Sequence, residues 1–176
     1  DMDTYLESLS KKDRHELRRK IRRAHMQAQV SWRKTESAEE LRYDLELFFR
    51  LHEASTPEKA GFWDDRARAF FCEIAHALQA DGRLELSFLT FDGRPVATYF
   101  CFIGGTEVPR DYLVYNSGFD PSYYRQSPGL VLCYYLIQDA IARRFRRFDF
   151  LRGDERYKYD LGGVDQPIYR LAIALA

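Results

Sequence analysis

The segment Ser127-Pro128-Gly129 has the composition of an anion-binding helix start. Serine is favoured as a helix cap and proline at the first helical position. The first backbone N–H groups of a helix have no partner inside it, and together with the positive end of the helix dipole they bind phosphate oxygens. Gly129 lacks a Cβ where such a ligand would approach. The segment predicts either a phosphate-binding helix start or a well-capped core helix whose glycine serves packing.

A second segment, Asp149–Lys158, concentrates acidic, basic and phenolic groups. Asp149 lies between two phenylalanines in a run that we expect to be a buried strand. A buried carboxylate is paired or has a raised pKa, and Arg152 and Lys158 are candidate partners. The pair could equally be structural, tying the strand to the following loop. Tyr157 and Lys158 diverge by about 100° on a helical turn, so only one of them can face a given site.

Other chemistry has weaker support in the sequence. Asn116-Ser117-Gly118 ends a predicted strand with residues that tolerate a β-bulge, although an ordinary turn has the same composition. Cys72 and His76 are four apart on a predicted helix, but further ligands are not evident, so we expect a structural histidine and no metal. Neither a Gly-x-Ser-x-Gly nor a Walker motif occurs, and no cysteine or serine stands in the setting of a nucleophile. If the protein transfers a chemical group, this favours direct transfer between two bound substrates over a covalent enzyme intermediate.

The elements that position these residues follow from capping and periodicity. Ser10 and Ser37 begin helices, and Asp92-Gly93 is a strong hairpin signal. We predict a basic helix from Ser10, a mixed sheet of six to seven mostly antiparallel strands, and helices on both of its faces, an α/β (α+β) arrangement. The predicted strands are 30–34, 84–91, 95–103, 111–117, 148–151 and 168–175, and the predicted later helices start near 37, 64, 127 and 154.

Composition restricts the classes of protein. The 176 residues carry 27 basic and 27 acidic side chains, which argues against general nucleic-acid binding, although positive charge is concentrated between Lys11 and Lys34. The three scattered cysteines favour a reducing compartment, so we expect a cytoplasmic protein. The longest apolar stretches are far shorter than a membrane span of about 20 residues.

Three runs carry a family resemblance: Tyr112–Pro121, Gln126–Gly129 and Phe148–Lys158. Together with the order of the elements, they resemble the acetyltransferase domain of the GNAT fold in the bacterial CelD-like or BioF2-like branch, which is related to Fem-type aminoacyltransferases. Residues 1–29 resemble a linker helix, and residues 30–176 the acyltransferase domain, as the C-terminal half of a longer tandem protein whose N-terminal domain would be a partner.

The resemblance implies an N-acyltransferase that moves an acyl group from acetyl-CoA or another acyl-CoA to a small-molecule or cell-envelope amine. The pyrophosphate would bind at the helix start and the pantetheine arm along the splayed end of strand 111–117; the residues implied are Asn116, Ser117, Gly118, Gln126, Ser127, Pro128, Gly129 and Leu130. Val131 departs from the family pattern, which has Gly or Ala there. The implied acceptor contacts are Tyr115, Arg152 and Asp154.

The resemblance also implies catalytic roles. Tyr157 would protonate the leaving thiolate, Asp149 or Glu155 would take the amine proton, and Lys158 would stabilise carbonyl charge in a Fem-like enzyme. Two alternatives stay open: a Fem-like transferase that uses aminoacyl-tRNA as donor, and a non-catalytic domain whose groove or basic helix binds a partner. We expect nucleic acid as a partner only in the first alternative.

Overall fold

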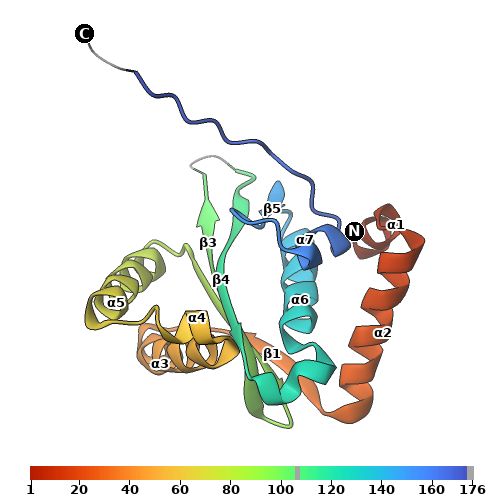
Figure 1. Ribbon diagram of the computed structural model, residues 1–176, viewed down its shortest axis with the longest axis horizontal. Coiled ribbons are helices and arrows are strands. Elements are labelled where there is room, and N and C mark those ends of the chain that lie inside the picture. Colours follow the sequence, from red (N-terminus) through yellow and green to blue (C-terminus); the bar gives the residue numbers. More distant parts are fainter. Residues whose placement is uncertain (106–107, 174–176) are drawn as a thin grey trace.

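The computed structural model describes residues 1–105 and 108–173. Its strands form one five-stranded sheet in the order β1-β2-β3-β4-β5 (Figure 1). Neighbouring strands are antiparallel except for β4 and β5, which are parallel, so the sheet is mixed and mostly antiparallel as predicted. The strand bounds are Val30–Lys34 for β1, Leu84–Phe91 for β2, Arg94–Gly104 for β3, Asp111–Phe119 for β4 and Arg147–Asp149 for β5.

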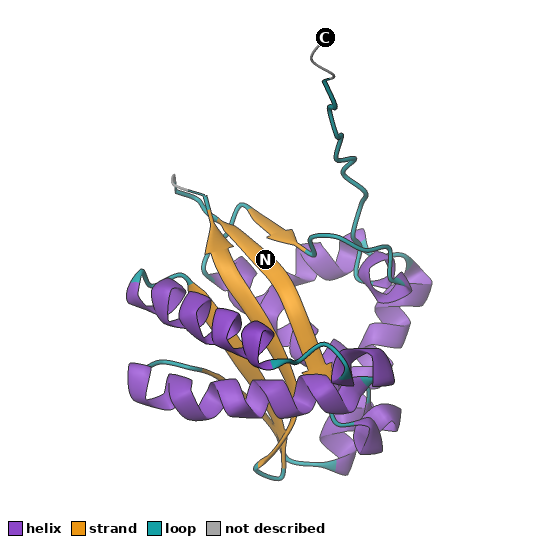
Figure 2. Cartoon of the chain, turned by 60° about the vertical axis from the view of Figure 1, so that its left-hand side comes forward, coloured by secondary structure: helices purple, strands orange, loops and turns teal. Residues whose placement is uncertain are grey.

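Helices cover both faces of the sheet, which confirms the predicted mixed architecture (Figures 1 and 2). On one face lie α3 (Ala38–Ser55), the single turn α4 (Pro57–Ala60) and α5 (Asp65–Ala80). This face has an aromatic core in which buried phenylalanines from both helices meet those of the sheet: Phe48, Phe49, Phe71, Phe88 and Phe100.

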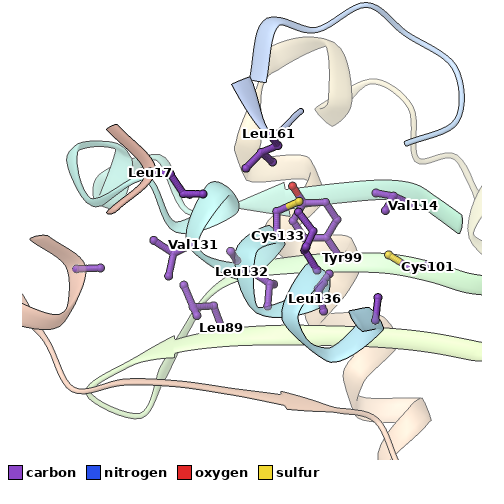
Figure 3. Packing of buried hydrophobic residues seen from close by; sticks show 14 of the residues in the cluster. Leu17, Leu89, Tyr99, Cys101, Val114, Val131, Leu132, Cys133, Leu136 and Leu161 are labelled. Carbon is purple, nitrogen blue, oxygen red and sulfur yellow. The ribbon is translucent and has the colours of Figure 1, made fainter. Parts of the chain in front are cut away.

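The opposite face is covered by α6 (Pro128–Ala142) and the N-terminal helices α1 (Met2–Ser8) and α2 (Lys11–Gln27). Leu17 of α2 packs in one buried cluster with residues of α6 and of the sheet, labelled in Figure 3. The basic segment therefore shares the core of the domain through its narrow apolar stripe. One helix was predicted here, whereas the chain forms two, α1 being capped by the Asp1 side chain.

Strand β4 is paired with β5 along its first part only. The α6 helix connects β4 to β5, and β5 pairs with β4 only along Asp111–Leu113. Beyond Asp149 the chain turns away into a loop and the short helix α7 (Arg156–Asp160). The second half of β4 therefore has β3 on one side and, within the described residues, no strand on the other.

The predicted six to seven strands are wrong for the part of the chain that the structure describes. The run 168–175 was expected to be the last strand, yet residues 168–173 have no regular structure and are exposed (Figure 1); the remainder lies outside the described residues. Its alternation suits a strand, but no described strand lies beside it, and a strand forms only where its backbone groups find partners.

Candidate functional site

The start of α6 presents free backbone donors. Ser127 adopts the left-handed region (φ 54°, ψ 50°) instead of the extended conformation usual for a cap. Ser127 is the cap residue, as predicted, but its side chain makes no capping hydrogen bond among the described residues. Pro128 is the first helical residue, and the Val131 N–H donates to the Ser127 carbonyl at 3.0 Å. The N–H groups of Gly129 and Leu130 lie before the first intrahelical bond and point out of the helix end.

The space in front of these donors is open. A Cβ built on Gly129 would have no heavy atom of the described residues within 4 Å, so the glycine does not serve packing within the chain. Val131, the departure from the family pattern, is fully buried in the core and turns its side chain away from this space. The Gln126 Oε1 atom is buried and has no partner among the described residues.

The helix end itself is the main source of positive charge here. The Arg23 guanidinium of α2 donates to the Arg125 carbonyl at 2.9 Å. Lys20 and Leu130 line a small hollow, but Asp13, Glu16 and Asp160 line the same hollow. The first turn of α6 contains no acidic residue, so the positive helix end and Arg23 favour an anion.

β4 contains a bulge, as the Asn-Ser-Gly run suggested. The register with β3 shifts between Phe100, which faces Asn116, and Cys101, which faces Val114. Tyr115 is therefore the extra residue, one position before the predicted run. Its ring is half exposed and lies against Phe71 on the α3 face.

Beyond the bulge, β4 is held from the side by α3 and α4. The Asn116 Oδ1 atom accepts hydrogen bonds from His52 and from the Ser117 N–H. The Ser117 carbonyl accepts one from Lys59. Gly118 allows close packing, because a Cβ there would lie 2.5 Å from the His52 backbone.

Asp149 does not occupy the predicted buried setting. Its side chain is about 29% exposed; it accepts a hydrogen bond from the Leu151 N–H at 2.7 Å and lies 3.6 Å from the Arg147 guanidinium. The proposed partners Arg152 and Lys158 do not make this pair. The flanking phenylalanines suggested full burial, but β5 ends at Asp149 and lies at the described edge of the sheet.

Tyr157 and Lys158 point in different directions, as their adjacency required. The Lys158 ammonium is buried and donates to the carbonyls of Arg152 and Gly153, and it pairs with Glu155 at 2.8 Å. This pairing lowers the pKa of Glu155, which is therefore a carboxylate at neutral pH. Lys158 thus braces the loop before α7.

Tyr157 turns toward the sheet. Its ring packs edge-on against Phe150 at 6.0 Å and joins the core cluster that contains Tyr99 and Cys133; Figure 3 shows these last two side by side. Burial is the main cause that raises the pKa of Tyr157, while a hydrogen bond with Tyr99 lowers it. The phenol is protonated at neutral pH and can donate its proton, although the raised pKa makes it a weaker acid than a free tyrosine.

The other predicted side chains face a separate hollow. A cavity of about 590 Å³ lies against the loop after β5 and is lined by Asp149, Arg152 and Lys158, with Val164 from the following chain. Arg152 and Asp154 are exposed. The predicted site residues therefore divide between the gap beside β4 and this outer hollow.

Sequence reasoning missed the cluster on the α3 face. His52, Lys59 and Trp63 are not among the predicted site residues. The structure places His52 between Trp63 and Asn116. Residues 64 positions apart meet here, and local spacing carries no signal for that contact.

Metal-binding groups and membrane-spanning helices are both missing from the described residues. Residues 1–105 and 108–173 contain no group of three or more His, Cys, Asp or Glu side chains that could hold a metal ion; His76 bonds the Cys72 carbonyl of its own helix. None of the helices in this part of the chain is long and apolar enough to cross a membrane.

The described residues combine a mixed sheet, a bulged strand whose second half has no second strand beside it, and a helix start with free donors, and this combination fits the acyltransferase class. The chain belongs to the acetyltransferase (GNAT) domain family, which it matches over residues 11–159. Members of this family generally take acetyl-CoA as the acyl donor.

Solved structures share the fold. A predicted acetyltransferase from Clostridium acetobutylicum with acetyl-CoA has a TM-score of 0.61 at 12% identity, covering 83% of this chain and 96% of that one. An aminoglycoside acetyltransferase from an uncultured soil metagenomic sample, in complex with sisomicin, has a TM-score of 0.59 at 15% identity, covering 84% of this chain and 97% of that one. A GCN5-related N-acetyltransferase from Ralstonia eutropha has a TM-score of 0.58 at 19% identity, covering 84% of this chain and 99% of that one. A search of curated proteins finds no match.

Proposed function

We propose that this domain transfers an acyl group, most simply acetyl, from acyl-CoA to a primary amine by direct attack within a ternary complex. The observation that carries the proposal is the start of α6, where two N–H groups, an open glycine and the Arg23 guanidinium come together. This arrangement fits a pyrophosphate, with Gly129 and Leu130 as donors and Gln126 beside them.

The pantetheine arm would lie beside the bulge of β4, in the short stretch between the end of the β5 pairing at Leu113 and the hydrogen bonds that α3 and α4 make from Ser117 onward. An extended chain with amide groups can hydrogen-bond an unpaired strand edge as an added strand does. The bulge at Tyr115 turns backbone groups of β4 away from the regular ladder. A backbone N–H fixed at this point would polarise the thioester carbonyl as negative charge develops on its oxygen.

Tyr157 is the best-placed proton donor for the departing thiolate among the four predicted catalytic residues, because it alone faces the sheet beside the gap. Glu155 is the better candidate base, since its carboxylate is ionised and exposed. Asp149 would act only through the outer hollow. Lys158 has a structural role, because its ammonium is taken by two carbonyls and Glu155.

The test measures thiol release from acetyl-CoA on addition of a panel of primary amines, with aminoacyl-tRNA as the alternative donor. Tyr157→Phe keeps the ring and removes the hydroxyl that would donate the proton, so it should lower kcat by about 100-fold with coenzyme A affinity unchanged. Tyr124→Phe is the matched control, because Tyr124 is 74% exposed. Transfer from aminoacyl-tRNA but not from acetyl-CoA would contradict the proposal, as would full activity of Tyr157→Phe.

A further inference from the structure

The chain holds a buried hydrogen-bonded relay that begins in α3 and ends on the backbone of β4. We infer that His52 is a positioning residue: it fixes Asn116, and through it the part of β4 that follows the bulge, in the geometry that acyl transfer requires. The inference rests on the proposed function for its consequence and on the following contacts for its geometry.

The relay has a defined direction. The Trp63 indole N–H donates to the His52 Nδ1 atom at 2.9 Å, so Nδ1 is an acceptor. The proton of the neutral ring is therefore on Nε2, which donates to the Asn116 Oδ1 atom at 2.8 Å. The same oxygen accepts the Ser117 N–H at 3.1 Å. Each atom of the relay has one role, and the His52 tautomer is set by Trp63.

The surroundings keep His52 neutral. It is only 3% exposed and packs between Phe48 and Trp63. Burial, followed by the nearby Lys59 ammonium, lowers its pKa to about 4. His52 is therefore a constant hydrogen-bond donor at physiological pH and is not a general base, because its acceptor nitrogen is already occupied.

The relay acts where β4 lacks a neighbour. β5 supports β4 only as far as Leu113. Beyond the bulge, lateral hydrogen bonds come from helices: His52 through Asn116, Lys59 to the Ser117 carbonyl, and Ser55 to both backbone groups of Phe119. α3 thus takes the place of a strand along this edge.

The relay helps to fix the bulge of β4 at Tyr115. Tyr115 lies between two supports, β5 at Leu113 and the relay at Asn116, so its backbone is held from both ends. Donors that stabilise a developing oxyanion must be fixed before the reaction, because reorganising them costs free energy. A loose Asn116 would weaken binding of the thioester end of the donor while leaving the phosphate contacts at α6 intact.

The experiment compares His52→Leu with His52→Gln, whose amide nitrogen can still donate to Asn116, and with His76→Leu, which removes an exposed histidine from α5 as the matched control. Trp63→Phe is the second variant if His52→Leu fails to fold, since it keeps an aromatic ring and removes the donor to Nδ1. Two readouts are taken: amide hydrogen exchange, and calorimetric affinity for acetyl-CoA and for 3′-phosphoadenosine 5′-diphosphate, which keeps the pyrophosphate and lacks the pantetheine arm.

We expect His52→Leu to accelerate exchange of the Ser117 amide about 10-fold relative to β2 amides such as Phe88, and to weaken acetyl-CoA binding about 10-fold, the value of one buried hydrogen bond. Affinity for 3′-phosphoadenosine 5′-diphosphate should be unchanged, and His52→Gln should recover most of both losses. Trp63→Phe should give smaller changes of the same kind.

The two readouts distinguish failure of the proposed function from failure of the positioning role of His52. If the unmodified chain binds neither ligand, the proposed function is wrong, and the inference loses its consequence with it. If it binds acetyl-CoA and the variants leave Ser117 exchange and acetyl-CoA affinity unchanged, the positioning role is wrong. Equal weakening of both ligands, or equal acceleration of all amides, would show that His52 supports only the fold, and this also overturns the inference.

Discussion

Gly129→Glu should stabilise the domain and abolish coenzyme A binding at the same time. A Cβ at this position meets no heavy atom of the described residues within 4 Å, so the new side chain fits. Replacing glycine inside a helix gains about 0.5 kcal/mol of stability. A carboxylate in a first helical turn that has no acid adds about 0.3–1 kcal/mol. The combined gain of about 1 kcal/mol should raise Tm by about 2–4 °C for a chain of this size.

The same carboxylate would occupy the position proposed for the pyrophosphate. Loss of that contact and charge repulsion should weaken coenzyme A binding by about 100-fold or more. Differential scanning calorimetry and isothermal titration measure the two effects. Gly118→Ala is the contrasting variant and should lower Tm, since its Cβ would lie 2.5 Å from the His52 backbone. A fall in Tm for Gly129→Glu, or unchanged coenzyme A affinity, would refute the reasoning.

Three further outcomes are expected. Lys158→Met should lower the free energy of unfolding by about 1–3 kcal/mol, because two carbonyls lose their donor, and urea denaturation measures it; an unchanged midpoint would contradict the bracing role. The pKa of His52 is lowered to about 4 in the fold, so between pH 6.5 and 4 the unfolded chain binds a proton that the folded chain does not. The free energy of unfolding should therefore fall by at most about 3 kcal/mol over this range, and by less in His52→Gln. Equal dependence on pH in the two chains would contradict this expectation. Arg23→Gln should weaken coenzyme A binding and lower the salt dependence of its affinity, and an unchanged salt slope would place Arg23 outside the anion site.

Local chemistry made much of the fold predictable. Asp92-Gly93 forms the β2–β3 hairpin with both residues at positive φ, as the dipeptide predicts. The Ser37 side chain caps α3 by accepting the Glu40 N–H. These features depend on neighbours within a few residues. The predicted strand 168–175 failed because strand formation depends on a partner that local sequence does not specify.

The candidate site was predictable only in part. The glycine at 129 and the bulge near Asn116 follow from backbone requirements, which are visible in residue types. The burial of Asp149 was misjudged because flanking phenylalanines do not reveal that β5 is three residues long. The His52 relay was invisible, since it joins α3 to β4 across the sheet.

The central claim is that an acyl-CoA lies between the start of α6 and the bulge of β4. Titration of the isotopically labelled chain with acetyl-CoA, followed by the chemical shifts of its backbone amides, tests this claim most directly. We expect saturable shifts at Gly129, Leu130 and Tyr115, with 3′-phosphoadenosine 5′-diphosphate, which lacks the pantetheine arm, moving only the first two. Saturating acetyl-CoA that leaves all three amides unmoved, or shifts only residues around the outer hollow at Arg152, would contradict the account.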